Sequence, residues 1–216
     1  NELIVILLLD MTLQRNLEKV RRDFVANVSH ELRSPLTSLV GFIETLLSDN
    51  DIDQKSRQKF LNIMDEEAKR MNRLIDDILS LSKVETEEHI TPSTSLSILD
   101  PIKSVISSLD ERGLSKNNKI LLINKSLDPT KPIYIIGNYD EITQVFTNLL
   151  ENAIKYGYEN SEIIVGVEKN KNKEITVIIT NEGEGIPQKY LERLTERFFR
   201  VDKARSRKIG GTGLGL

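Results

Sequence analysis

The chain has 216 residues, of which 38% are hydrophobic and 29% are charged. This composition is too apolar for a disordered tail and too polar for a protein embedded in a membrane. Thirty Lys and Arg side chains nearly balance 33 Asp and Glu, so the formal charge of −3 gives no general bias towards nucleic acid or an anionic membrane. The sequence has no cysteine, which excludes a disulfide framework, a thiolate nucleophile and a cysteine-based zinc site. Because composition and charge do not identify a function, the function must be inferred from local motifs.

The N-terminal segment Leu3–Leu9 is a continuous run of leucine and β-branched residues, which predicts a buried strand. The run is too short to cross a membrane, because a spanning helix needs about 20 apolar residues. Asp10 and Thr12 then offer an N-cap for a helix. We expect residues 1–12 to be the last strand and the exit of a preceding domain.

Apolar periodicity predicts two long helices, over residues 13–47 and 54–84. In the first helix apolar residues recur at gaps of three or four, and Pro35 is expected to introduce a kink. In the second helix the apolar spacing is close to a heptad, and four charged residues are expected outside this stripe: Glu66, Glu67, Lys69 and Arg70.

The polar turn at residues 48–53 predicts that the two helices form an antiparallel hairpin, assigned to residues 13–88. A single hairpin leaves part of each apolar stripe exposed to water. We therefore expect a homodimer in which two hairpins form a four-helix bundle.

A polar linker is expected at residues 89–96, and a second domain with mixed helices and strands at 97–216. The expected helices cover 98–109 and 140–156, and the expected strands cover 119–123, 133–136, 163–167 and 175–180. Strands mixed with helices, with neighbours at hairpin spacing, predict an α+β sandwich. Because the chain stops in a glycine-rich turn, we expect this domain to be incomplete at its C-terminus.

The first candidate site is the segment Ser29–Pro35 on the first helix. His30 could act as a nucleophile at neutral pH, and the adjacent Glu31 could hold one imidazole tautomer and stabilise developing positive charge. Ser34 lies four residues further on the same helical face and could orient a water molecule. An ordinary surface histidine is the alternative that this pattern leaves open.

The second candidate site is a helical face formed by Asn148, Asn152, Lys155 and Tyr156, which follow one another at helical spacing. Amide oxygens suit Mg²⁺ that arrives with phosphates, and a lysine supplies a positive charge for a phosphate. A polar face exposed to solvent would show the same pattern.

The third and fourth candidate sites are glycine-rich. In the segment Asn181–Pro187, the glycines Gly183 and Gly185 allow the backbone to approach a flat ligand, and a side-chain oxygen can accept from an exocyclic amine. The backbone amides of a terminal loop could hold phosphates, and its glycines include Gly211, Gly213 and Gly215. A basic stretch that includes Arg200 precedes this loop. Either segment alone could be a simple turn.

Together, these motifs resemble the sensor histidine kinases of bacterial two-component systems, most of all the PhoR-like and WalK-like members. The segments similar to the family's H, N, G1, F and G2 boxes are, in this order, Phe24–Thr37, Asn148–Tyr156, Asn181–Pro187, Glu196–Asp202 and Gly211–Leu216. The segment before residue 13 also resembles the last strand and exit of a PAS sensor domain. The resemblance implies a dimerisation and phosphotransfer hairpin followed by an ATP-binding domain.

The resemblance also implies roles for individual residues. His30 would accept the γ-phosphoryl group of ATP and pass it to an aspartate in the receiver domain of a response regulator. Glu31 would act as general base or hold the tautomer, and Ser34 would position water when the protein dephosphorylates its partner. Asn152 would bind Mg²⁺, supported by Asn148. The remaining nucleotide-binding residues would be Lys155, Tyr156, Asn181, Gly183, Gly185, Arg200, Gly211, Gly213 and Gly215.

The same resemblance implies the cytoplasmic portion of a membrane-anchored bacterial sensor, attached to the membrane only through upstream segments and with no nucleic-acid partner. Three positions depart from the family pattern. Asn181 replaces the usual Asp, which predicts weaker nucleotide binding, Ser34 replaces the usual Thr or Asn, and Thr195 replaces a Phe of the F box. These departures leave open a weakened kinase that acts as a dimeric scaffold or phosphatase. Another ATPase with the same nucleotide fold is disfavoured, because it would need no phosphoacceptor such as His30.

Overall fold

The computed structural model describes residues 10–48, 52–87, 91–111, 118–126, 131–170, 172, 174–202 and 211–215. The strand expected at 3–9 and the basic residues after Asp202 lie outside the described residues. The chain divides into two compact units, Asn1–Ser80 and Leu81–Leu216, and each is described by itself. No helix in the described ranges is long and apolar enough to cross a membrane.

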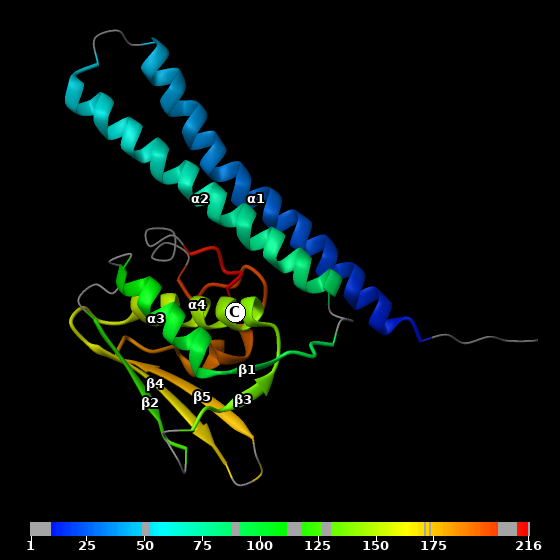
Figure 1. Ribbon diagram of the computed structural model, residues 1–216. Helices are drawn as coiled ribbons and strands as arrows, with labels where there is room; N and C mark the ends of the chain where they lie inside the picture. Colours follow the sequence, from blue (N-terminus) through cyan, green and yellow to red (C-terminus); the bar gives the residue numbers. More distant parts are fainter. Residues whose placement is uncertain are drawn as a thin grey trace, which may run out of the picture. The chain divides into compact units, whose positions relative to one another are not determined.

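Two long helices confirm the predicted hairpin (Figure 1): α1 covers Thr12–Ser48 and α2 covers Gln54–Glu87, and the first unit contains all of α1 and the part of α2 up to Ser80. Their contacts run in opposite directions along the chain, since Phe42 packs on Phe60 with ring centroids 5.2 Å apart and Glu31 pairs with Arg70. The side chain of Pro35 lies within α1 and is fully buried. At the start of α1, the Thr12 amide donates to the Asp10 carboxylate at 2.9 Å, as the predicted cap requires.

The sequence pattern suggested that all four charged residues lie outside the apolar stripe of α2. In the structure, two of them take part in the contact between the helices. Glu66 and Lys69 are exposed, but Glu67 is half-buried and the side chain of Arg70 is only 12% exposed. The expectation was wrong for Arg70 because a long guanidinium side chain can cover apolar surface while its head pairs with a carboxylate of the facing helix.

The second unit mixes helices and strands and confirms the predicted α+β class. Its elements in chain order are β1 (Ser95–Ser97), α3 (Leu99–Glu111), β2 (Lys119–Asn124), β3 (Tyr134–Ile136), α4 (Tyr139–Tyr156), β4 (Glu162–Lys169), β5 (Ile175–Asn181) and the 3₁₀ helix η1 (Gln188–Arg193). The expected linker is shorter at its C-terminal end, because Ser95 and Leu96 belong to β1 and pair with Ile136 and Ile135.

Two sheets organise this unit. The first sheet is the antiparallel pair of β1 and β3, and the second has the order β2–β4–β5, with β4 parallel to β2 and antiparallel to β5. Figure 1 shows α3 and α4 on one side of the three-stranded sheet. The inward residues of β4, Ile163, Val165 and Val167, are fully buried in the same apolar cluster as Ile102 of α3 and Leu150 of α4. This core fixes the position of α4, which carries the second candidate site.

Candidate functional site

On α1, the candidate nucleophile His30 is exposed to solvent, as its predicted role requires. Ser34 is also exposed and lies one helical turn further on the same face. Glu31 differs from both, because its side chain is only 21% exposed and faces α2. The structure therefore presents His30 and Ser34 to solvent and places the neighbouring carboxylate between the helices.

The partner of Glu31 is a residue that the sequence pattern missed. Arg70 Nη2 donates to Glu31 Oε2 at 3.0 Å, and Arg70 Nη1 lies 3.6 Å from Glu67 Oε2, one turn earlier on α2. The only signal in the sequence is a charged pair at (i, i+3) spacing beside an apolar stripe, which is common on exposed helix faces.

On α4, the four predicted polar residues lie on the side away from the core. Asn148, Asn152 and Lys155 are half-buried and Tyr156 is 41% exposed, while Phe146, Leu150, Ala153 and Ile154 are buried. Gln144 is an addition to the predicted set, because its Nε2 donates to Asn148 Oδ1 at 3.0 Å. This contact fixes the orientation of the Asn148 amide.

The turn after β5 lies against the end of α4. Gly157 and Gly183 form an isolated antiparallel bridge, and the Tyr158 amide donates to the Glu182 carbonyl at 2.9 Å. A Cβ atom on Gly183 would lie 2.6 Å from the Tyr156 carbonyl oxygen, closer than any real side chain can approach. Glycine is therefore required at position 183 for this contact. Asn181, at the end of β5, is exposed.

The terminal glycine segment also reaches α4. A Cβ atom on Gly215 would lie 3.8 Å from Cγ of Asn148, which is ordinary contact distance. Gly213 has a φ of +78°, which favours glycine, and its carbonyl accepts from the Phe198 amide at 2.7 Å. Two candidate segments, the turn after β5 and the terminal glycine segment, thus lie against the C-terminal half of α4, which carries a third.

Arg200, which the sequence assigned to the nucleotide, has a partner within this segment. Its Nη2 donates to the Thr212 carbonyl, so this arginine binds the backbone of the glycine segment. The contact is compatible with an indirect role, in which Arg200 holds the loop that carries the backbone amides. The other basic residues of the stretch after Asp202 lie outside the described part of the chain.

The F-box segment packs through Phe199, although Thr195 replaces a phenylalanine. The guanidinium of Arg193 lies 4.3 Å from the centre of the Phe199 ring, and Tyr190 packs on the same ring at 5.8 Å. Arg193 also pairs with Glu196 at 2.9 Å, and this hydrogen-bonded pair lowers the pKa of the Glu196 carboxyl. Phe199 and Arg193 thus supply packing at the segment where Thr195 removes a ring.

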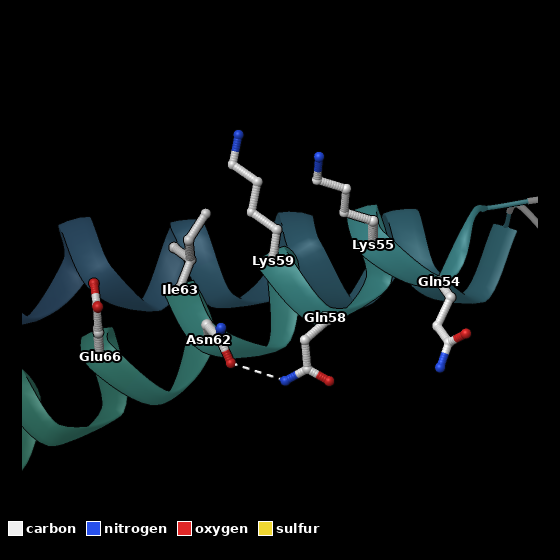
Figure 2. Close-up of a pocket in the computed structure, with 7 residues that line it drawn as sticks. All are labelled: Gln54, Lys55, Gln58, Lys59, Asn62, Ile63 and Glu66. Atoms are coloured by element: carbon white, nitrogen blue, oxygen red, sulfur yellow. Dashed lines mark hydrogen bonds between the residues drawn. The ribbon is translucent and has the colours of Figure 1, made fainter.

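An open surface hollow lies on the N-terminal half of α2 (Figure 2). None of the predicted site residues lines this hollow, and its lining residues are Gln54, Lys55, Gln58, Lys59, Asn62, Ile63 and Glu66. Figure 2 shows the Gln58 amide donating to Asn62, at 2.9 Å, and the two lysine side chains extending into solvent. The hollow is therefore a feature of the helix surface, separate from the candidate residues.

In the described ranges, no group of three or more His, Cys, Asp or Glu side chains could hold a metal ion. The face with Asn148 and Asn152 offers amide oxygens, which are hard neutral ligands of the kind that Mg²⁺ accepts.

Comparison with known proteins gives two domain matches and several relatives. Residues 20–87 match the His Kinase A (phospho-acceptor) domain, and residues 137–216 match the histidine kinase-, DNA gyrase B- and HSP90-like ATPase family. The chain is 36% identical over 214 residues to the sensor histidine kinase WalK of Bacillus subtilis, and this alignment covers 99% of this chain and 34% of the relative. It is 38% identical over 208 residues to the sensor protein kinase WalK of Staphylococcus aureus, in an alignment that covers 96% of this chain and 49% of the relative.

Among solved structures, the histidine kinase ThkA in complex with the response regulator protein TrrA aligns with a TM-score of 0.70 and 26% identity, over 87% of this chain and 53% of that one. The histidine kinase AdeS of Acinetobacter baumannii aligns with a TM-score of 0.61 over 86% of this chain and 82% of that one, and its 22% identity shows the fold alone.

The chain thus combines a His Kinase A (phospho-acceptor) domain with an ATPase domain of the histidine kinase-, DNA gyrase B- and HSP90-like family. Over nearly its whole length it is similar to the WalK sensor histidine kinases. The chain spans between a third and a half of the length of these curated relatives.

Proposed function

We propose that this chain transfers the γ-phosphoryl group of ATP to His30 and then to an aspartate of a response regulator. The observation that carries the proposal is the exposed His30 on a helical hairpin that matches the phospho-acceptor family, joined to a domain that matches the ATPase family. The complex of ThkA with TrrA supports a receiver domain as the partner.

In the proposed first step, one imidazole nitrogen of His30 attacks the γ-phosphorus of ATP. The nitrogen–phosphorus bond forms, the bond from the γ-phosphorus to the bridging oxygen breaks, and ADP leaves. Glu31 accepts the proton from the other imidazole nitrogen or holds it in a hydrogen bond. Ser34, exposed on the same face, positions water when the protein acts as a phosphatase of its partner.

The nucleotide is proposed to bind at the polar face of α4. Asn152, supported by Asn148, fits a hard cation through its amide oxygen, and Mg²⁺ there would neutralise phosphate charge. Lys155 and Tyr156 contact the nucleotide, and Asn181 accepts a hydrogen bond from the adenine amino group. The convergence of the Gly183 turn and the Gly215 segment on α4 supports a single binding region.

We infer that the chain is a homodimer through the hairpin. The second apolar face of α1 is exposed in one copy, with Val40 45%, Ile43 43% and Leu47 77% exposed at helical spacing. A second hairpin would bury this face in a four-helix bundle. Similarity to the WalK sensor kinases supports a cytoplasmic position next to a membrane anchor that belongs to other parts of the sensor.

The direct test is incubation of the chain with ATP labelled on the γ-phosphate. The expected product is a protein-bound phosphate that is labile in acid and stable in base. The label should be absent from His30→Ala and present in His89→Ala, which removes the second histidine of the sequence. Label that persists in His30→Ala would contradict the proposed acceptor.

A weakened kinase that acts as a dimeric scaffold or phosphatase is the second candidate, favoured by Asn181 and Thr195. ATP-binding measurements separate the two functions. A chain that shows no ATP binding yet removes phosphate from a phosphorylated receiver domain would support the second candidate.

A further inference from the structure

A charged triad crosses the hairpin one residue away from His30. Glu31 on α1 pairs with Arg70 on α2 at 3.0 Å, and Glu67 lies 3.6 Å from the same guanidinium. The three side chains are 21%, 12% and 27% exposed, so all are largely withdrawn from water. The triad lies entirely within the first unit of the chain.

The position of Glu31 on the helix makes this pairing important. Adjacent side chains on a helix do not face each other, so the Glu31 carboxylate reaches the His30 ring only in particular rotamers. Arg70 binds Oε2 of Glu31 from the opposite helix and thereby restricts these rotamers. A half-buried carboxylate that loses an ion-pair partner becomes less stable in its buried rotamer, because its desolvated charge is then less well compensated.

Glu67 faces the same guanidinium at ion-pair distance but without a hydrogen bond, because its buried Oε2 lies 3.6 Å from Arg70 Nη1. It lies one turn before Arg70 on α2, and the two Nη atoms of Arg70 face different carboxylates. A planar fork with several donors can serve both carboxylates at once, whereas a lysine offers only a point charge. The triad therefore depends on arginine at position 70.

We propose that Arg70 is a positioning residue for phosphorylation of His30, acting through Glu31. The proposal rests on the proposed function and deepens it, since it adds a residue of α2 to the acceptor site of α1. Arg70 keeps the Glu31 carboxylate at the hairpin interface, one residue from the imidazole of His30. The packing of the two helices thus becomes a condition for a competent acceptor.

The first experiment compares labelling of His30 in the full chain with that in Arg70→Met. We expect the rate at saturating ATP to fall by about tenfold, by analogy with the lower end of the losses that follow when the hydrogen-bond partner of a metal-binding residue is removed. The ATP concentration at half-saturation should not change, because no predicted nucleotide residue lies in the first unit. Arg70→Lys should recover part of the rate.

Lys69→Met is the matched control. It removes the same charge one residue earlier, where Lys69 pairs with Asp65 at 2.6 Å but both side chains are 60% exposed or more. Surface pairs of this kind contribute little, so the labelling rate should stay within twofold of that of the unchanged chain. Thermal melting and self-association of each variant show whether the hairpin is intact.

A double-mutant cycle with Glu31→Gln distinguishes positioning from a purely structural role. If Arg70 acts through Glu31, Arg70→Met should cause no further loss in the Glu31→Gln background. Equal losses in both backgrounds would overturn the proposal. An unchanged rate in Arg70→Met would also overturn it and would leave the proposed function intact.

Phosphoramidate gives a donor that needs no ATP site. Its nitrogen–phosphorus bond breaks, ammonia leaves, and the phosphoryl group forms the same bond to His30. We expect Arg70→Met to slow this reaction as well. Labelling by phosphoramidate without labelling by ATP would contradict ATP-dependent kinase activity. In that case the comparison with Arg70→Met in phosphoramidate would still decide the role of the triad.

Discussion

Replacement of Asn181 by Asp adds a negative charge at the end of β5 with almost no change in side-chain shape. Asn181 is exposed, and the contact of its Nδ2 with the Glu182 carbonyl is long, at 3.5 Å. Little stabilising interaction is lost when a carboxylate replaces the amide. The substitution therefore tests ligand recognition with little effect on the fold.

The expected gain follows from the strength of the two kinds of hydrogen bond. A bond to a charged group contributes about 1.5–3 kcal/mol and a neutral bond about 1 kcal/mol, so the carboxylate should gain about 0.5–2 kcal/mol. This corresponds to about 2- to 30-fold tighter binding of ATP. Because Asn181 is exposed and Glu182 and Glu184 already add negative charge nearby, we expect a result in the lower half of this range.

Isothermal titration of the chain and of Asn181→Asp with ATP measures the difference. Inosine triphosphate is the ligand control, since it carries an oxygen in place of the adenine amino group, and its binding should not tighten. Asn124→Asp is the protein control, because it adds the same charge at the opposite end of the sheet and keeps the acceptor for the Ser126 amide. Equal ATP affinity for the chain and Asn181→Asp would refute this account of Asn181.

Three further substitutions test the fold and the assembly. Gly183→Ala should lower the melting temperature and weaken nucleotide binding, because its Cβ would lie 2.6 Å from the Tyr156 carbonyl oxygen. Ile43→Glu should convert the dimer into monomers in light scattering, since it places a charge within the exposed apolar face of α1. Asp53→Ala should lower the melting temperature at pH 7, because the Asp53 carboxylate accepts from the Ser56 hydroxyl and amide at the start of α2. These bonds lower the pKa of Asp53, so their stabilisation is present above the ordinary value of 3.8 and is lost as the pH falls through the lowered pKa.

Each of these tests has a matched comparison. Gly166→Ala places its Cβ at ordinary contact distance, 3.8 Å from the Ile178 carbonyl oxygen, and a fall in melting temperature as large as that of Gly183→Ala would argue against the clash as the cause. Lys55→Glu changes an exposed side chain of the α2 hollow and should leave a dimer, so monomers from both variants would contradict the proposed interface. Asp53→Asn keeps a capping oxygen and should remove the acid dependence of this cap. A melting temperature that falls as much at acid pH as in the unchanged chain would contradict the assignment of this dependence to Asp53.

The helices were predictable because their apolar residues repeat with the helical period over many turns. Both ends of α1 and α2 agree with the predicted ranges within a few residues, and α4 begins one residue before the predicted start. The strand β1 was missed because three residues carry no period of their own. Its stability comes from pairing with β3, almost forty residues later in the chain.

The sequence indicated candidate residues but not the contacts between them. The sequence indicated that Asn148 and Asn152 share a face, which follows from helical spacing alone. It could not indicate that Gly215 packs beside Asn148 or that Arg200 binds the Thr212 carbonyl, because these contacts depend on how loops far apart in the chain return to α4. The parallel pairing of β2 with β4 is likewise a property of the complete sheet.

Two of the polar residues that the pattern missed lie one helical turn before the residue that they contact. Gln144 lies one turn before Asn148, and Glu67 lies one turn before Arg70, so each support comes from the (i, i+3) or (i, i+4) neighbour on the same helix. Such a neighbour restricts the rotamer of a half-buried polar side chain without any change in the backbone. Arg70, in contrast, reaches Glu31 from the opposite helix, so helical spacing could indicate Gln144 and Glu67 but not Arg70.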